Sequence, residues 1–70
     1  MNPLIRTAAD GIFHQYAQLT PLVQPLTAQQ LNDLEHEAKE LEHSPEFSIR
    51  TGAHIVRAAV VMTQEARKSQ

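Results

Sequence analysis

Apolar residues recur along most of this chain at spacings of three and four, which place them on one face of an α-helix. The pattern predicts helices over about residues 3–19, 28–43 and 45–67, joined by a linker at 20–26. The expected fold class is all-α. We predict one domain over residues 1–70: a small three-helix bundle, or a helical hairpin with an N-terminal helix, completed by dimerisation.

Helix start signals occur at three places. Asn2 before Pro3 predicts the first start, because Asn accepts a hydrogen bond from a free amide and proline suits the first turn. Thr27 and Gln30 have the spacing of a capping box, which predicts the second start. The Ser-Pro-Glu sequence at 44–46 predicts that the third helix begins almost without a loop.

Glycine and proline interrupt the first part of the pattern. Gly11 falls inside the first predicted helix, where it either lets another helix approach closely or marks a weak point. Pro21 and Pro25 end the helical pattern, because proline lacks an amide donor and restricts the residue before it. The linker stays apolar, so we expect it to lie across the bundle; its apolar residues are Leu22, Val23 and Leu26.

The third predicted helix is the most apolar and has two apolar faces. The first face contains Phe47, Ile55, Ala58, Ala59, Met62 and Ala66. The second face contains Ile49, Ala53, Val56 and Val60. The second predicted helix offers only a narrow apolar seam, made of Leu31, Leu34, Ala38 and Leu41. One face therefore needs another cover, which is either the linker or a second copy of the chain.

All three predicted helices are expected to contribute to one core. The contributing residues are Ile5, Ile12, Leu34, Leu41, Ile55 and Met62. A chain of 70 residues buries a smaller share of its surface than a larger domain, so it usually needs a disulfide, a metal or a second subunit. Cysteine is absent, so a metal or a second subunit remains.

Charge and hydropathy limit the partners. Six Lys and Arg against eight Asp and Glu give a formal net charge of -2, which argues against nucleic acid as the main partner. The longest apolar run, residues 58–62, is too short to cross a membrane. We therefore expect a cytoplasmic protein that does not act on membranes.

One pattern resembles a set of metal ligands. His36, Glu40 and His43 stand at i, i+4 and i+7 on the second predicted helix, and zinc accepts such groups. That face lies opposite the leucine seam and is expected to face water, with no fourth ligand or dry surroundings. A solvated polar face is favoured over a metal site, and we expect no cofactor.

Signals for catalysis or for phosphate contacts are weak. Most carboxylates lie on exposed positions of the second predicted helix, and the chain lacks a glycine-rich loop and a cysteine nucleophile. Arg50, Arg57 and Lys68 form a thin basic stripe on the third helix, with His54 beside it. These side chains are expected to face water or to pair with acids of the second helix.

These patterns favour a non-enzymatic protein that binds another protein: a small regulator, inhibitor or adaptor with an apolar helical surface. The expected interaction residues are those of the second face, Ile49, Ala53, Val56 and Val60, and a homodimer is expected to form there. A small dimeric DNA-binding regulator and a metal-binding helical protein are the alternatives.

Overall fold

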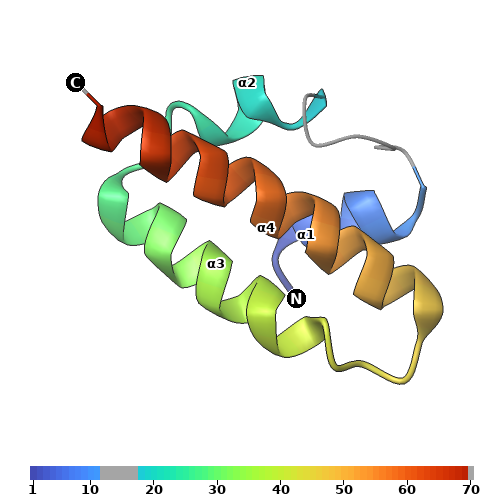
Figure 1. Ribbon diagram of the computed structural model, residues 1–70. Helices are drawn as coiled ribbons and strands as arrows, with labels where there is room; N and C mark the ends of the chain where they lie inside the picture. Colours follow the sequence, from blue (N-terminus) through green and yellow to red (C-terminus); the bar gives the residue numbers. More distant parts are fainter. Residues whose placement is uncertain (12–17, 70) are drawn as a thin grey trace.

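The computed structural model describes residues 1–11 and 18–69, in which the regular structure is helical and contains no strand (Figure 1). The helices are α1 (Pro3–Ala9), α2 (Thr20–Val23), α3 (Ala28–Leu41) and α4 (Phe47–Lys68). The Cα radius of gyration, 11.2 Å, is close to the roughly 11 Å of a compact domain of this length. The predicted all-α class is confirmed.

The long helix α4 is the central element. α1 and α3 pack along it, and α2 contacts it on a further side (Figure 1). α3 and α4 run antiparallel and are joined by a short turn, as expected for a hairpin. The core collects apolar residues from every helix and from the turn before α2: Ile5, Ala8, Leu19, Val23, Leu31, Leu34, Ala38, Ala53, Val56, Ala59 and Val60.

α1 and α4 come unusually close at Gly52. A Cβ atom added to Gly52 would lie 2.6 Å from the Ala9 nitrogen and 2.8 Å from the Ala9 Cα. These neighbours are backbone atoms, which cannot rotate away as a flexible side chain would. The small residue at position 52 therefore sets the distance between the two helices.

α1 ends at Ala9, well before the predicted end near residue 19, and this corrects the predicted first helix. Gly11 adopts a φ of +84°, a left-handed conformation that glycine reaches without steric cost. Its amide donates to the Ala8 carbonyl at 3.0 Å, a bond typical of helix termination at glycine. Gly11 therefore ends α1. The predicted core residue Ile12 lies outside the described residues.

The predicted linker contains the one-turn helix α2 and lies against α4, as expected. Val23 is fully buried. The Arg67 guanidinium of α4 donates to the Gln24 carbonyl at 2.8 Å and to the Leu26 carbonyl at 2.6 Å. These bonds join residues more than forty positions apart and fix the end of α2 on α4.

Two of the predicted start signals are confirmed in detail. The Asn2 side chain accepts from the Leu4 amide at 2.8 Å, and Thr27 and Gln30 make both bonds of a capping box. The third helix begins later than predicted, at Phe47, without a side-chain cap. Ser44 instead accepts from the Glu46 amide at 3.2 Å, which shapes the turn before α4.

The second apolar face of α4 is covered within the chain, contrary to the expectation that a partner chain covers it. Ala53, Val56 and Val60 are each 0 % exposed, and Ile49 is half-buried. α1 and α2 supply cover that the leucine seam of α3 alone cannot give. The predicted core residue Met62 is instead 51 % exposed.

The other predicted core residues that the structure describes lie in the core or at its margin. Ile5 and Leu34 are buried, and Leu41 and Ile55 are partly buried against the core. None of the helices formed by residues 1–11 and 18–69 has the length and hydropathy needed to cross a bilayer.

Candidate functional site

The side of α4 that faces away from the core carries the two most exposed large apolar side chains of the described residues. Phe47 is 74 % exposed and Met62 is 51 % exposed. Fifteen residues at 100° each place them about 60° apart around the helix, on the same side. We define the α4 outer face by six residues on that side: Phe47, Thr51, His54, Ala58, Val61 and Met62.

Phe47 stands at the N-terminal end of the α4 outer face with one neighbour on its ring. The Arg50 guanidinium carbon lies 5.7 Å from the ring centroid, within cation–π range. Arg50 also donates to the Ser44 carbonyl at 2.8 Å, so its position is held by the turn before α4. The aromatic side chain is therefore supported yet open to solvent.

A groove beside Met62 lies between α2 and α4. It has a volume of about 420 Å³ and is lined by Thr20, Gln24, Met62, Thr63, Ala66 and Arg67. Arg67 closes one side, because its guanidinium is bonded to the linker carbonyls. We call this the α2–α4 groove; with Met62 on its edge, it joins the C-terminal half of the α4 outer face.

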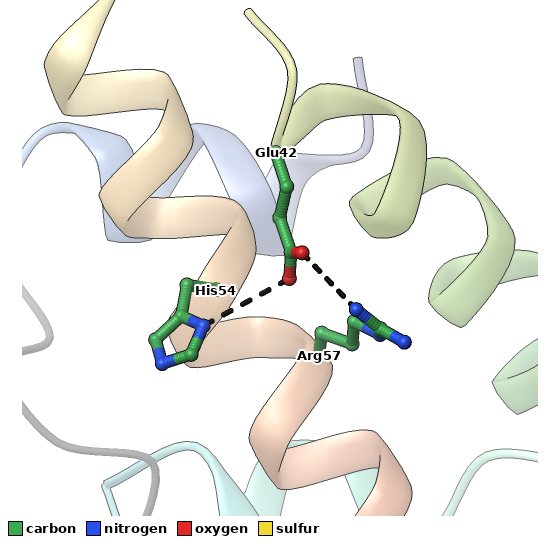
Figure 2. Close-up of polar contacts among 3 residues, drawn as sticks. All are labelled: Glu42, His54 and Arg57. Atoms are coloured by element: carbon green, nitrogen blue, oxygen red, sulfur yellow. Dashed lines mark hydrogen bonds and ion pairs between the residues drawn. The ribbon is translucent and has the colours of Figure 1, made fainter.

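A polar cluster lies where the end of α3 meets α4 (Figure 2). The Arg57 guanidinium donates to Glu42 Oε2 at 3.1 Å, and His54 Nδ1 lies 3.9 Å from Glu42 Oε1. In the described part of the chain, Oε1 is buried and has no hydrogen-bond donor. The predicted pairing of the basic stripe with acids of the second helix is thus confirmed for Arg57.

The cavity at this cluster is small and open. Its volume is about 220 Å³, below the roughly 300–1,000 Å³ of most small-ligand pockets. The side chain of His54 is 79 % exposed. Water therefore reaches the His54 imidazole, whereas Glu42 Oε1 is shielded from it.

A further cavity of about 430 Å³ lies between the start of α1 and α3. Leu4, Leu26 and Leu34 give it an apolar floor, and Asp33 and Glu37 lie at its polar rim. Glu37 accepts a bond from the backbone amide of residue 2 at 2.7 Å, and Asp33 accepts from a Gln29 side chain. Both carboxylates already have partners, and the Glu37 bond ties the start of α1 to α3.

The three candidate metal ligands do not come together as a site. His36 Nε2 lies 3.7 Å from Glu40 Oε1, with both side chains at least 75 % exposed, and His43 is exposed. Among residues 1–11 and 18–69, no three His, Cys, Asp or Glu side chains are close enough to hold one metal ion. His36 and Glu40 form a surface pair along α3.

The predicted interaction residues and the observed exposed residues lie on opposite sides of α4. The sequence pattern showed two apolar faces but not which one the chain covers itself. Gly52 carried a usable signal, because a small residue beside the second face marks the side where another helix can approach. Phe47 and Met62, which the sequence pattern placed on the first apolar face, are the large apolar residues of α4 that remain exposed.

Comparison with models of known protein families, with curated proteins and with solved structures finds no match. A functional proposal for this chain therefore rests on its own geometry.

Proposed function

We propose that this chain is a non-enzymatic protein-interaction module, a small regulator, inhibitor or adaptor that binds another protein through the α4 outer face. The observation that carries the proposal is the shared exposure of Phe47 and Met62, at 74 % and 51 %, on one side of the helix. Aromatic side chains and Met are enriched in protein interfaces, and interfacial pockets filled by aromatic residues supply much of the binding energy.

The arrangement of Phe47 and Met62 supports this proposal more than their exposure alone. Single exposed apolar residues are common on protein surfaces and need no function. Here Ala58 and Val61 lie between the two large residues, and the α2–α4 groove opens beside Met62. A partner helix laid along α4 would meet these apolar side chains with polar Thr51 and His54 among them, as in the helix-in-groove mode of recognition.

A non-enzymatic role is supported by the exposure of the ionisable groups. The side chains of His36 and His54 are 78 % and 79 % exposed, and the carboxylates near them lie in open positions or in ion pairs. A DNA-binding role has less support, because Arg50, Arg57 and Arg67 are engaged with carbonyl or carboxylate groups of the chain itself.

The experiment compares partner capture by the native chain with capture by two double variants. Phe47→Asp with Met62→Glu places two negative charges on the α4 outer face. Ser48→Asp with Asn32→Glu adds the same charge at exposed positions away from it. Each chain is immobilised, exposed to an extract of its host and analysed by quantitative mass spectrometry.

The native chain and the control pair are expected to retain the same specific partners, and the outer-face pair is expected to lose them. Circular dichroism checks that both variants keep their helices. The proposal fails if the outer-face pair is folded and captures the same proteins in the same amounts.

A further inference from the structure

We propose that the α2–α4 groove binds a small aromatic carboxylate, a ligand in which a negatively charged carboxylate is carried on an aromatic ring. The carboxylate of the ligand pairs with Arg67, and its ring lies against Met62 and Ala66. This inference goes beyond the proposed function, because it concerns a small-molecule site between α2 and α4 and not a partner protein. The size, the lining and the charge of the groove all support this class of ligand.

The groove is a short channel between two helix faces. α2 lies against the C-terminal half of α4, where Arg67 is bonded to the Gln24 carbonyl (Figure 1). The lining residues occur in pairs spaced by four, which lie one above the other on a helix face. The pairs are Thr20 with Gln24, Met62 with Ala66, and Thr63 with Arg67. The volume of about 420 Å³ lies within the roughly 300–1,000 Å³ of small-ligand pockets, so the groove suits a ligand with a single ring.

The lining of the groove combines one cationic group with apolar surface. Among the described residues that line it, Arg67 is the only charged one, so no carboxylate there repels a negatively charged ligand. The Met62 thioether and the Ala66 methyl group supply the apolar surface. Sulfur–aromatic contacts are favourable, which favours a ring over an alkyl chain beside Met62. These groups together match an apolar acid.

The Arg67 guanidinium is held in place, but its charge is not neutralised. Its Nη2 donates to the Gln24 and Leu26 carbonyls at 2.8 and 2.6 Å. A guanidinium has five N–H donors, and those on Nε and Nη1 make no hydrogen bond within the described part of the chain. No carboxylate of residues 1–11 and 18–69 forms an ion pair with Arg67. Because two bonds already fix this side chain, it loses little freedom when an anion binds.

The neighbouring basic side chains of α4 differ from Arg67 in both respects. Arg57 lies 3.1 Å from a Glu42 carboxylate oxygen, and Lys68 lies 3.4 Å from one of Glu65. Neither of them lines the groove. Hydrogen bonds between a guanidinium and a carboxylate are roughly twice as strong as those between neutral groups. Arg67 is therefore the residue of this half of α4 that can hold an anion inside a cavity.

The first test uses probes that separate the charge from the ring. Phenylacetate carries both, phenethyl alcohol carries the ring alone, and acetate carries the charge alone. Each is titrated into the isotope-labelled full chain, and the amide shifts of Gln24, Thr63 and Arg67 are followed by NMR. Phenylacetate is expected to bind with a dissociation constant on the order of 1 mM, because ligands of this size bind weakly. The other two probes are expected to bind at least about tenfold more weakly.

Phenylacetate that gives no saturable shift at these amides up to about 20 mM overturns the proposal. Binding of phenethyl alcohol or of acetate as tight as that of phenylacetate also overturns it, since the site would then recognise only one part of the ligand.

The second test locates the site with two variants and a control. Ala66→Leu fills the groove from an exposed position and leaves Arg67 in place, and Arg67→Gln removes the charge. Both are expected to weaken phenylacetate binding at least about tenfold, and Arg67→Gln is expected to leave the binding of phenethyl alcohol unchanged. Lys68→Gln removes the same charge one residue away and is expected to bind phenylacetate as the native chain does.

Circular dichroism checks that the variants fold. If Arg67→Gln releases the linker from α4, Ala66→Leu still decides the outcome, because it retains the bonds of Arg67. A folded Ala66→Leu chain with native affinity for phenylacetate overturns the site. A loss in Lys68→Gln equal to that in Arg67→Gln indicates general attraction to a basic surface and also overturns it. None of these results affects partner capture, which is tested by the Phe47 and Met62 double variant.

Discussion

Gly52→Ala tests the close approach of α1 to α4, on which the covering of the second apolar face depends. The new Cβ would lie 2.6 Å from the Ala9 nitrogen, where ordinary contact begins near 3.4 Å, so the helices must separate by up to 0.8 Å. Such a gap loses a quarter to a half of the dispersion energy of the facing atoms. The contacts of Ile5 and Ala8 with α4 would weaken.

Two effects of opposite sign decide the result. Alanine is favoured over glycine inside a helix by about 1 kcal/mol, and overpacking a tight contact costs about 1–3 kcal/mol. Since the clashing atoms are backbone atoms, we place the cost of overpacking at the upper end of that range. We therefore predict that Gly52→Ala lowers the free energy of unfolding by about 1–2 kcal/mol. In a domain of this size this lowers the melting temperature by roughly 5–15 °C.

The assay is thermal unfolding followed by circular dichroism, with Thr51→Ala as the control. Thr51 is the preceding residue of α4 and is exposed, so its replacement changes helix propensity without a clash. The control is expected to melt at or slightly above the native temperature. If Gly52→Ala also melts at or above it, α1 does not lie against α4 as described.

Three further variants test separate parts of the structure. Leu34→Ala removes a buried side chain and is expected to cost about 2–5 kcal/mol in urea unfolding, whereas a loss below about 0.5 kcal/mol would show that the α3 seam is not in the core. Gly11→Ala is expected to cost about 1 kcal/mol of unfolding free energy, because alanine is strained at a φ of +84°. An unchanged midpoint of urea unfolding would contradict the role of Gly11 in ending α1. His36→Gln with His43→Gln is expected to leave the melting temperature unchanged with or without zinc, and a zinc-dependent rise in the native chain alone would indicate a metal site.

Local signals in the sequence predicted local structure well. The Thr27 capping box and the Asn2 cap involve bonds between residues two or three apart, so the sequence contains everything that determines them. The α3 seam was predicted for a similar reason, because helical periodicity depends on short spacings. Gly11 was misplaced because one glycine fits both a helix interior and a helix end, and the choice depends on how the following chain packs.

The faces of α4 could not be assigned from the sequence because both are apolar. Their assignment depends on contacts across the whole chain: Gly52 against Ala9, and Arg67 against the linker carbonyls. Periodicity gives the angle of a residue around its own helix but not which neighbour lies there. The alternative in which the linker covers the second face was open from the sequence, and the structure favours it through the burial of Val23.

The most direct measurement of this account compares the reactivity of thiols placed on the two faces of α4. Val60→Cys lies on the covered face and Met62→Cys on the outer face, two residues away, in a chain that has no other cysteine. At a few micromolar, Met62→Cys is expected to react with a disulfide reagent at the rate of a free thiol, because position 62 is exposed. Val60→Cys is expected to react at least about a hundredfold more slowly, because opening a small folded domain costs about 3 kcal/mol or more. Equal rates would show that the second face is open in the single chain and would contradict the account.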